Sequence, residues 1–295
     1  MKTILLLVFF TLMFSGCESK PNRPMVVSAN LWIGYSPLYY AEKKGWLRES
    51  GDIKLVRTVS LGESLELFNG GHSDMVCGTQ YEIQKIQNAQ SELGSVILLD
   101  RSNGGDFVLS NRTIDELKSE QKIDVYLEVE SVNTLLLKYF MDKYTLKPSQ
   151  MNMIDSSQGL NARLSMKKDA TIIVTYDPYN IKLIKRGYKE VGSTKDRELL
   201  VVDAIYAPTK TEKNFSKEMA ELNRLVYKSL EVLKSNPKEY FEAINSYYEY
   251  DNYTAFEEAT KLIEWIYSDH TVVFNKHNEM SQSKLPNLIE AFKDK

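Results

Sequence analysis

Short apolar runs with strand character alternate along this chain with stretches in which apolar residues recur every three or four positions. This alternation predicts parallel β-strands joined by α-helices. The first unit begins with the apolar pair Val26 and Val27 and continues into a helix that Pro37 opens and Gly45 ends. Proline suits a first helical turn and glycine suits a helix end, and we predict Ser36 as the N-cap.

One arrangement occurs twice, in residues 60–82 and 160–179. Each copy predicts a helix, a short polar turn, an apolar strand and a loop that carries threonine and tyrosine. The helix of the second copy is expected over residues 160–166. Because ligands of open α/β sheets bind beyond the carboxyl ends of the strands, the two copies predict two lobes whose loops face each other.

Two further apolar runs, at residues 96–99 and 199–202, are placed to carry the chain between these lobes. We expect each run to be a strand that ends at an acidic residue, Asp100 or Asp203. The predicted fold class is therefore α/β, with two parallel-rich sheets joined by two hinge strands. This division assigns residues 25–103 and 203–295 to lobe I and residues 104–202 to lobe II.

The last ninety residues predict helices that cover lobe I. Apolar residues recur at helical spacing from Met219 to Leu233, Pro237 opens a second helix, and a capping box from Thr254 to Glu257 opens a third. The many tyrosines and phenylalanines here are expected to pack in the core or on the surface rather than to bind a ligand.

The amino-terminal segment predicts export. Lys2 precedes an apolar run over residues 4–14 that is too short to span a bilayer, and small residues precede Cys17. Residues 1–16 are thus predicted to be a signal peptide. Residues 14–17 resemble a bacterial lipobox, which implies lipidation of Cys17, a linker over residues 17–24, and a membrane-anchored protein that faces the periplasm or the cell exterior. An ordinary signal peptide with an incidental cysteine is the alternative.

Composition and motifs exclude several classes of function. The net charge is −3 with both signs interspersed, so no basic stripe favours nucleic acid. If Cys17 is lipidated, Cys77 has no partner for an internal disulfide. His72, His270 and His277 lie in separate segments without metal-ligand spacing, and no nucleophile motif is present. We therefore predict no catalytic residue, metal or cofactor, and no enzymatic activity.

Aromatic and hydrogen-bonding side chains gather instead at the predicted strand ends. Aromatic rings can cover a small organic molecule while hydroxyl, amide and carboxylate groups bind its polar atoms. Thr79 and Ser131 are also plausible helix caps, and Tyr176 could fill the core between the lobes. The predicted ligand-binding residues are Trp32, Tyr35, Ser36, Thr79, Gln80, Tyr81, Asp100, Ser102, Glu128, Ser131, Tyr176, Asp177 and Tyr206.

The segment from Asn30 to Leu47 closely resembles the opening of solute-binding proteins that serve ABC importers of nitrate, taurine, aliphatic sulfonates and the pyrimidine precursor of thiamine. In these proteins the pattern W-x-G-Y-x-P-L-Y-x-A-x-x-x-G-[WF] recurs. Residues 176–179, Tyr-Asp-Pro-Tyr, resemble their W-[DE]-P-[YF] pattern, with tyrosine in place of tryptophan. The resemblance covers almost the whole exported chain and is strongest at residues 30–47 and 165–180.

This resemblance implies a two-lobed periplasmic-binding-protein fold of type II that captures a small molecule and hands it to an ABC permease and ATPase. A sensory role, in which the closed form docks on a membrane receptor, stays open. An enzyme acting on a pyrimidine-like compound is a weaker alternative, because fungal relatives with that activity carry a cysteine-rich iron motif that this chain lacks.

The chain departs from its relatives where the first long helix of lobe II begins, with Glu128 to Ser131 in place of a Gly/Ser-rich turn. Such carboxylates repel an anionic ligand. They form part of a predicted acidic rim with Arg101 as the nearby counter-charge, which favours an amine or a ring N–H, as in a pyrimidine or an amino-sulfonate, over nitrate or a simple sulfonate. Alternatively, the carboxylates cap helices or pair across the hinge. The rim comprises Asp100, Glu128, Glu130, Asp177 and Asp203.

Overall fold

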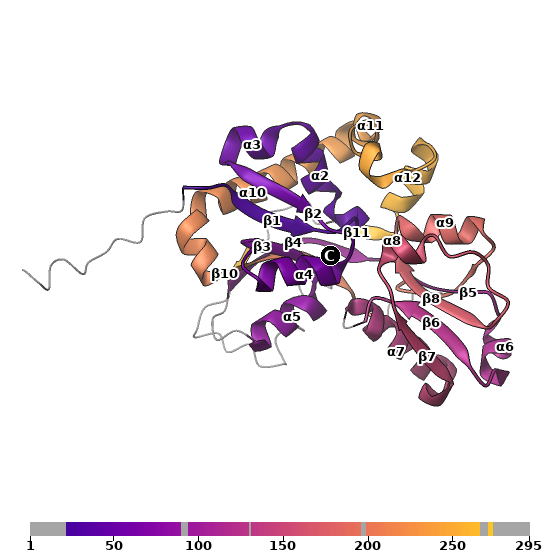
Figure 1. Ribbon diagram of the computed structural model, residues 1–295. Helices are drawn as coiled ribbons and strands as arrows, with labels where there is room; N and C mark the ends of the chain where they lie inside the picture. Colours follow the sequence, from indigo (N-terminus) through magenta and orange to yellow (C-terminus); the bar gives the residue numbers. More distant parts are fainter. Residues whose placement is uncertain (1–21, 90–93, 130, 196–198, 266–270, 274–295) are drawn as a thin grey trace, which may run out of the picture.

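Two mixed β-sheets covered by helices build the molecule, and they lie side by side in the computed structural model (Figure 1). The structure describes residues 22–89, 94–129, 131–195, 199–265 and 271–273. The predicted signal peptide, Cys17, Glu130, His270 and His277 lie outside these residues. No helix within them is both long enough and apolar enough to cross a membrane.

Lobe I is built on the first sheet, with strand order β11-β4-β10-β3-β1-β2 and with β12 also paired to β4. β1 runs parallel to β2 and β3, whereas β10 is antiparallel to both β3 and β4. The strands are β1 (Met25–Ala29), β2 (Ile53–Arg57), β3 (Met75–Thr79), β4 (Gly94–Ser102), β10 (Val202–Pro208), β11 (Ile263–Trp265) and β12 (Thr271–Val273). The helices are η2 (Ile33–Tyr35), α2 (Ser36–Lys43), α3 (Trp46–Gly51), α4 (Leu61–Asn69), α5 (Gln80–Ala89), α10 (Thr209–Ser235), α11 (Pro237–Tyr248) and α12 (Tyr253–Thr260).

Lobe II is built on the second sheet, with strand order β7-β6-β8-β5-β9. β6 is parallel to β7 and β8, and β5 is antiparallel to β8 and β9. The strands are β5 (Asp106–Ser110), β6 (Ile123–Leu127), β7 (Met151–Asp155), β8 (Thr171–Tyr176) and β9 (Lys189–Ser193). The helices are α6 (Ile114–Ser119), α7 (Val132–Tyr144), η3 (Pro148–Gln150), α8 (Gln158–Asn161) and α9 (Tyr179–Lys185).

The two-lobed α/β fold is confirmed, but the sheets are mixed rather than parallel-rich. The antiparallel members β5 and β10 are the first strands that the chain enters after each passage between the sheets. These passages run from Ser102 to Asp106 and from Ser193 to Val202. A hydroxyl pair joins them, with 2.6 Å between Ser102 Oγ and Thr194 Oγ1.

Both crossing strands differ from their predicted bounds. β4 extends to Ser102, so Asp100 lies inside the strand, and the predicted strand over residues 199–202 begins only at its last residue. Val201 instead packs with Leu61 and Val132 in an apolar cluster that contains residues of both lobes. The run at 199–201 is therefore apolar because it fills the lobe junction.

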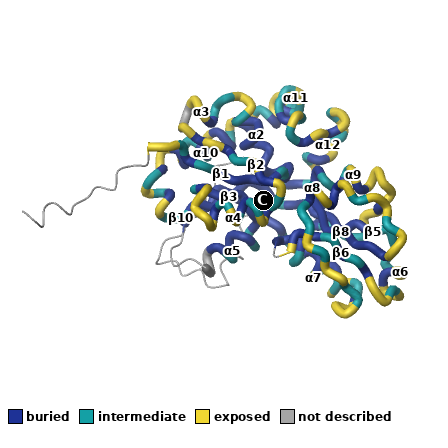
Figure 2. Tube along the Cα trace, viewed as in Figure 1, coloured by how far each residue is buried: buried dark blue, intermediate teal, exposed yellow. Residues whose placement is uncertain are grey.

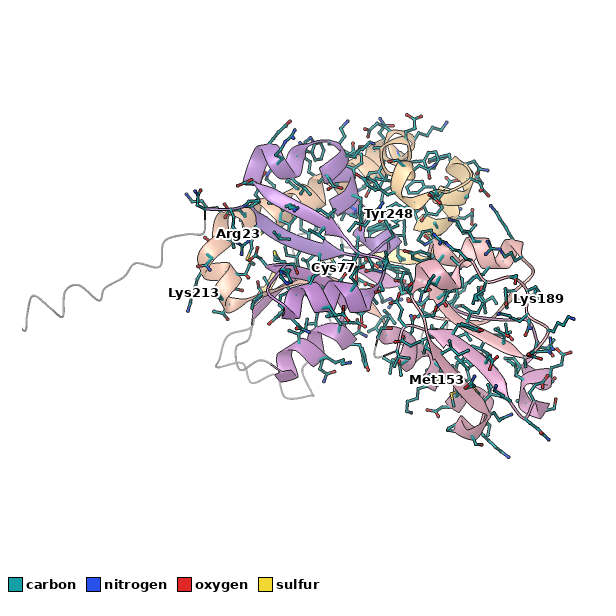
Figure 3. The ribbon with its side chains drawn as sticks, viewed as in Figure 1. Arg23, Cys77, Met153, Lys189, Lys213 and Tyr248 are labelled. Carbon is teal, nitrogen blue, oxygen red and sulfur yellow. The ribbon has the colours of Figure 1, made fainter. Side chains whose placement is uncertain are left out.

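Alternating strand positions divide the lobe I core between two faces. One face packs against α2, α10 and α11 and includes Cys77 and Ile205, while the other packs against α4 and α5 and includes Val76 and Tyr206. Figure 2 shows the central strands of this sheet as buried segments under more exposed helices, and β3 and β10 are buried along almost their whole length, whereas the edge strand β2 is partly exposed. Cys77 and Tyr248, which Figure 3 labels, both belong to the first of these cores.

Local sequence signals place several helix starts correctly. Ser60 accepts the Glu63 N–H at the start of α4, and Ser131 accepts the Asn133 N–H at the start of α7. Thr113 forms the capping box of α6 with Glu116. These caps act within one turn of chain, so neighbouring residues suffice to predict them.

Three other predicted starts are wrong. α2 begins at Ser36 itself, after Tyr35 as N-cap, and the helix expected over 160–166 is only the short α8. α12 begins at Tyr253 because Asn252 accepts the Ala255 N–H at 3.0 Å, and this pre-empts the predicted box at Thr254.

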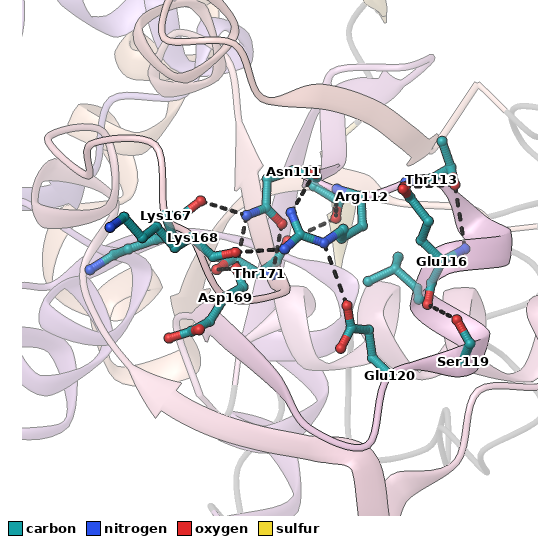
Figure 4. A network of polar contacts seen from close by, with 12 residues as sticks. Asn111, Arg112, Thr113, Glu116, Ser119, Glu120, Lys167, Lys168, Asp169 and Thr171 are labelled. Carbon is teal, nitrogen blue, oxygen red and sulfur yellow. Dashed lines mark hydrogen bonds and ion pairs between the residues drawn. The ribbon is translucent and has the colours of Figure 1, made fainter.

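A polar network closes the outer end of lobe II (Figure 4). Asn111 donates to the carbonyls of Lys167 (2.9 Å) and Asp169 (2.8 Å) and accepts from Thr171 N (2.9 Å). It thereby joins the end of β5 to the start of β8 and leaves the opposite end of the sheet facing lobe I.

Candidate functional site

A small cavity of about 10 Å³ lies where the two lobes meet. The carboxyl ends of β1, β3 and β8 and the starts of β5 and β10 surround it, because antiparallel strands begin where their parallel neighbours end. A space of this size holds one water molecule at most, so a larger solute enters only when the lobes separate. The lining residues are Asn30, Trp32, Tyr35, Leu61, Thr79, Asp106, Val132, Tyr176 and Asp203.

Aromatic rings from both lobes meet in this wall. Trp32 of lobe I and Tyr176 of lobe II form an edge-to-face contact with 6.0 Å between ring centroids. Gly105, in the passage between the sheets, is required for this arrangement, since a Cβ there would lie 2.4 Å from Trp32 Cη2. The lobes therefore contact each other through rings that could also cover a solute.

Two hydrogen bonds order the polar groups of the wall. Asn30 Nδ2 donates to the Tyr176 hydroxyl at 2.8 Å, across the lobe junction, and the Tyr35 hydroxyl donates to Asp203 Oδ1 at 2.6 Å. Among the residues that the structure describes, Asn30 Oδ1 and Asp106 Oδ2 have no hydrogen-bond partner although both are buried. Buried polar atoms are normally paired, so two free acceptors around one cavity are typical of a binding site.

Asp100 and Asp203 form a buried carboxyl pair beside the cavity. They are direct neighbours across β4 and β10. Burial, and then the charge of Asp203, raises the pKa of Asp100 well above its usual range, and burial likewise raises the pKa of Asp203. Within the described chain neither oxygen of Asp100 makes a hydrogen bond of good geometry, and one of them packs against Gly34, where a Cβ would lie 1.9 Å away.

Other buried carboxyl groups strengthen this acidic character. Burial raises the pKa of Asp106 to about 7 and that of Glu128 to about 8, and it also raises the pKa of Glu82. No lysine or arginine is among the residues that line the cavity, and Arg101 pairs with Glu264 at 2.8 Å. In the described ranges no three His, Cys, Asp or Glu residues are arranged to hold a metal ion.

An open groove of about 850 Å³ lies next to the cavity, between α4 of lobe I and the loops that precede α7 and α8 in lobe II. Glu128 and Ser131 line it, together with Glu63, Glu66 and Asp155. Since Gly62 and Ser131 in its wall neighbour Leu61 and Val132 of the cavity, the groove is the direct approach to the lobe junction.

The structure brings together about half of the predicted binding residues. Trp32, Tyr35, Thr79 and Tyr176 line the cavity, and Asp100 lies behind it. Glu128 and Ser131 line the groove, where Ser131 is also the N-cap that the sequence predicts.

Two predicted residues lie in the core of the protein, away from the cavity. Tyr206 packs on Phe68 with 5.7 Å between ring centroids, on the face of the sheet opposite to Asp203. The Ser36 hydroxyl pairs with that of Tyr240 at 3.0 Å, so it is neither a helix cap nor part of the cavity wall.

Asp177 and the remaining predicted residues support the junction rather than the cavity wall. The Asp177 carboxylate accepts a hydrogen bond from Tyr250. The Gln80 side chain donates a hydrogen bond to Leu200 O and accepts one from Val202 N, so it holds the passage that leads back into lobe I. The Ser102 hydroxyl pairs with that of Thr194 and holds the passage that leads into lobe II. Tyr81 is half-buried under the ammonium group of Lys85.

Sequence reasoning missed Asn30, Glu82 and Asp106 as site residues. Asn30 directly follows β1, which is a usable signal for a residue at a strand end. Asp106 is the first residue of β5, and no motif in the sequence marks that strand start. Glu82 completes the predicted capping box by accepting the Thr79 N–H at 2.9 Å, and its contacts with the other lobe carry no local signal.

Comparisons with known proteins agree with this architecture. The ligand-binding component of an ABC-type import system from Staphylococcus aureus, solved with zinc bound, has a TM-score of 0.67 at 13% identity, and the match covers 92% of each chain. The alkanesulfonate-binding protein SsuA from Xanthomonas axonopodis pv. citri, bound to MOPS, has a TM-score of 0.66 at 13% identity over 83% of this chain and 88% of that one. The periplasmic aliphatic sulphonate binding protein SsuA from Escherichia coli has a TM-score of 0.65 at 13% identity over 92% and 94%.

Likeness at this level of identity shows the fold alone. A comparison of the sequence with curated proteins finds no match. The family model described as NMT1/THI5 like matches residues 32–240, which is well over half of the chain and runs through both lobes. The chain therefore belongs to the NMT1/THI5-like family.

Proposed function

We propose that this chain is an extracytoplasmic solute-binding lipoprotein that captures a small organic solute between its lobes and delivers it to an ABC importer. The observation that carries this proposal is the convergence of aromatic and unpartnered polar side chains from both lobes on one cavity. The family supports it, as do two structural neighbours, one a ligand-binding component of an ABC-type import system and the other an alkanesulfonate-binding protein.

Capture requires a hinge motion. Lobe I comprises residues 25–103 and 203–295, lobe II comprises residues 104–202, and the passages around Gly105 and Thr194 act as the hinge. A cavity of about 10 Å³ admits no organic solute, so the closed form must open first. The solute then stabilises closure through contacts that exist only in the closed state.

The solute carries an amine or a ring N–H, as a pyrimidine or an amino-sulfonate does. Asp106 and Asp203 line the cavity and Asp100 adjoins it, with no basic side chain in the cavity wall. A hydrogen bond between a donor and a charged acceptor contributes about 1.5–3 kcal/mol, so one such contact changes affinity at least tenfold. Nitrate and simple sulfonates offer acceptors to a wall that already has an excess of them.

A thermal-shift screen of the exported chain against amines, pyrimidines, alkylsulfonates and nitrate tests the solute class. A ligand at a hundred times its Kd adds about 2.7 kcal/mol to the free energy of unfolding. We expect stabilisation by an amine-bearing compound, with a loss of affinity in Asp106→Asn and none in the exposed control Asp115→Asn. Stabilisation by nitrate or alkylsulfonate alone would contradict the proposed class.

Delivery and anchoring have separate tests. Deletion of the gene should abolish uptake of the solute that binds, whereas unchanged uptake would favour the sensory role. Metabolic labelling with a fatty acid should mark the wild-type protein and not Cys17→Ser; equal labelling of both would exclude Cys17 as the lipid attachment site.

A further inference from the structure

Four helices begin at the lobe junction, two in each lobe. A helix N-terminus combines free N–H groups with a partial positive charge, and several of them around one space make a favourable anion site. α4 and α5 belong to lobe I, and α7 and α8 belong to lobe II. Leu61 and Val132, the first residues of α4 and α7, and Thr79, which precedes α5, line the cavity itself.

Two buried glutamates already occupy these helix starts. Glu82 of lobe I accepts from Val132 N of lobe II at 2.7 Å and from Thr79 N of its own lobe at 2.9 Å. Glu128 of lobe II accepts from Leu61 N of lobe I at 3.2 Å and from Gln158 N, which opens α8, at 3.3 Å. Each carboxyl group thus caps one helix of its own lobe and one of the opposite lobe.

The backbone leaves little donor capacity for a ligand at the start of α7. The next N–H group, of Asn133, donates to the Ser131 hydroxyl at 3.1 Å. The one after it, of Thr134, donates to the Ser131 carbonyl at 2.9 Å. Because a carboxyl oxygen accepts an N–H whether the group is ionised or neutral, occupancy of the helix ends does not depend on charge.

A second observation shows what the junction does offer. Asn30 Oδ1 and Asp106 Oδ2, in buried residues of the cavity wall, have no hydrogen-bond partner among the described residues. Asn30 Oδ1 is an acceptor, and Asp106 Oδ2 is one when its carboxyl group is ionised. The Trp32 indole N–H is a donor of the wall that also lacks a hydrogen bond of good geometry among the described residues, and it lies beside the Asp100 carboxyl group. The junction therefore has the backbone N–H groups of its helix ends filled and side-chain oxygens free, with its one free indole N–H next to a carboxyl group, which disfavours an anion.

We propose that Glu82 and Glu128 are specificity-determining residues that close the helix ends at the lobe junction to anionic solutes and leave the free acceptors for a hydrogen-bond donor. This inference rests on the proposed solute-binding function. It differs from a general acidic repulsion, because it assigns the exclusion to two carboxyl groups whose four oxygens accept hydrogen bonds from backbone N–H groups at the helix starts.

Alanine and glutamine variants separate occupancy from charge. Glu82→Ala and Glu128→Ala vacate the helix ends, whereas Glu82→Gln and Glu128→Gln remove the charge but keep one of the two accepting oxygens, which can still occupy the N–H group of the opposite lobe. With propane-1-sulfonate as the probe in titration calorimetry, we expect the alanine variants to gain affinity about ten- to a hundredfold over the wild type, the factor of one charge-assisted hydrogen bond. The glutamine variants should gain little.

Glu116→Ala is the matched control. Glu116 also accepts a backbone N–H at a helix start, from Thr113 at 2.7 Å, but α6 lies at the end of lobe II far from lobe I (Figure 1). It should leave sulfonate affinity unchanged. The proposal is overturned if wild type and alanine variants bind propane-1-sulfonate equally, or if the glutamine variants gain as much as the alanine variants.

Two further measurements keep the outcome decisive. Binding of an amine by the wild type, without any sulfonate gain in the alanine variants, overturns this inference and leaves the proposed function standing. If the alanine variants do not fold, hydrogen exchange of the wild type decides: sulfonate should not alter the protection of Leu61 N–H and Val132 N–H, and a change in either overturns the proposal.

Discussion

Two buried, aromatic-rich regions, one in lobe I and one at the lobe junction, differ in how their polar atoms are satisfied. The C-terminal aromatic cluster consists of Tyr240, Phe241, Tyr248, Tyr250 and Phe256, with ring centroids 5.5–6.2 Å apart in its packed pairs. Its hydroxyl groups are paired: Tyr248 donates to Trp32 O at 2.8 Å, and Tyr250 donates to Asp177. The cavity wall has equally buried rings, yet two of its acceptors lack partners within the described residues.

This difference separates a structural region from a binding region. In the aromatic cluster each buried tyrosine hydroxyl has a hydrogen-bond partner, so the cluster stabilises the fold. Unpartnered buried acceptors at the cavity cost stability, and proteins retain such groups where a ligand uses them. The cavity should therefore respond to substitution in affinity, and the aromatic cluster in stability.

The pH dependence of stability should show the largest effect. Burial raises the pKa of Asp106 from 3.8 to about 7 and that of Glu128 from 4.5 to about 8, so both stay protonated in the folded chain at pH values where the unfolded chain loses the proton. Their contribution is full below about pH 4 and falls, by about 1.4 kcal/mol per pH unit for each group, as the pH rises towards the folded values.

Urea unfolding of the solute-free protein, repeated at pH values from about 4 to about 8, measures how steeply the free energy of unfolding falls with pH. Asp106→Asn and Glu128→Gln should each flatten it. An amine-bearing solute favours ionised carboxylates, so its stabilising effect should grow with pH, and an effect that shrinks with pH would argue for an anionic solute.

Phe256→Ala tests the aromatic cluster at its centre. Phe256 is buried and packs with Tyr240, Phe241 and Tyr250. Truncation of a buried phenylalanine lowers the free energy of unfolding by about 3–5 kcal/mol. Affinity for the solute should stay unchanged in calorimetry, and Phe256→Leu should cost less. A large loss of solute affinity in a folded Phe256→Ala protein would contradict the claim that the aromatic cluster serves stability alone.

A matched pair of single-group changes gives the smallest and sharpest contrast. Tyr250→Phe removes the donor to Asp177 and should cost about 1–3 kcal/mol, because a buried carboxyl loses its partner. Asp100→Asn removes the like-charged neighbour of Asp203 and should leave stability equal or higher while affinity for an amine falls about tenfold. Urea unfolding at constant pH measures the stability of both variants. Equal effects on stability would contradict the distinction between a stabilising aromatic cluster and a ligand-binding cavity.

Sequence patterns determined the order of strands and helices and many of the local signals. Apolar runs marked β3 and β8, and the cap at Ser131 fixed the start of α7. These signals depend on side-chain spacing within a few residues, which the chain carries whatever its tertiary structure. The motif around Trp32 also directed attention to the correct strand end.

The tertiary structure decided which polar groups meet and which face each strand residue takes. Because β10 contains Asp203 and Tyr206 rather than ending before them, alternation sends Tyr206 to Phe68 and Asp203 to the cavity. The capping of α7 by Glu82 and of α4 by Glu128 joins residues 50 and 67 positions apart. No local pattern encodes such contacts, because they exist only after two separately folded sheets close on each other.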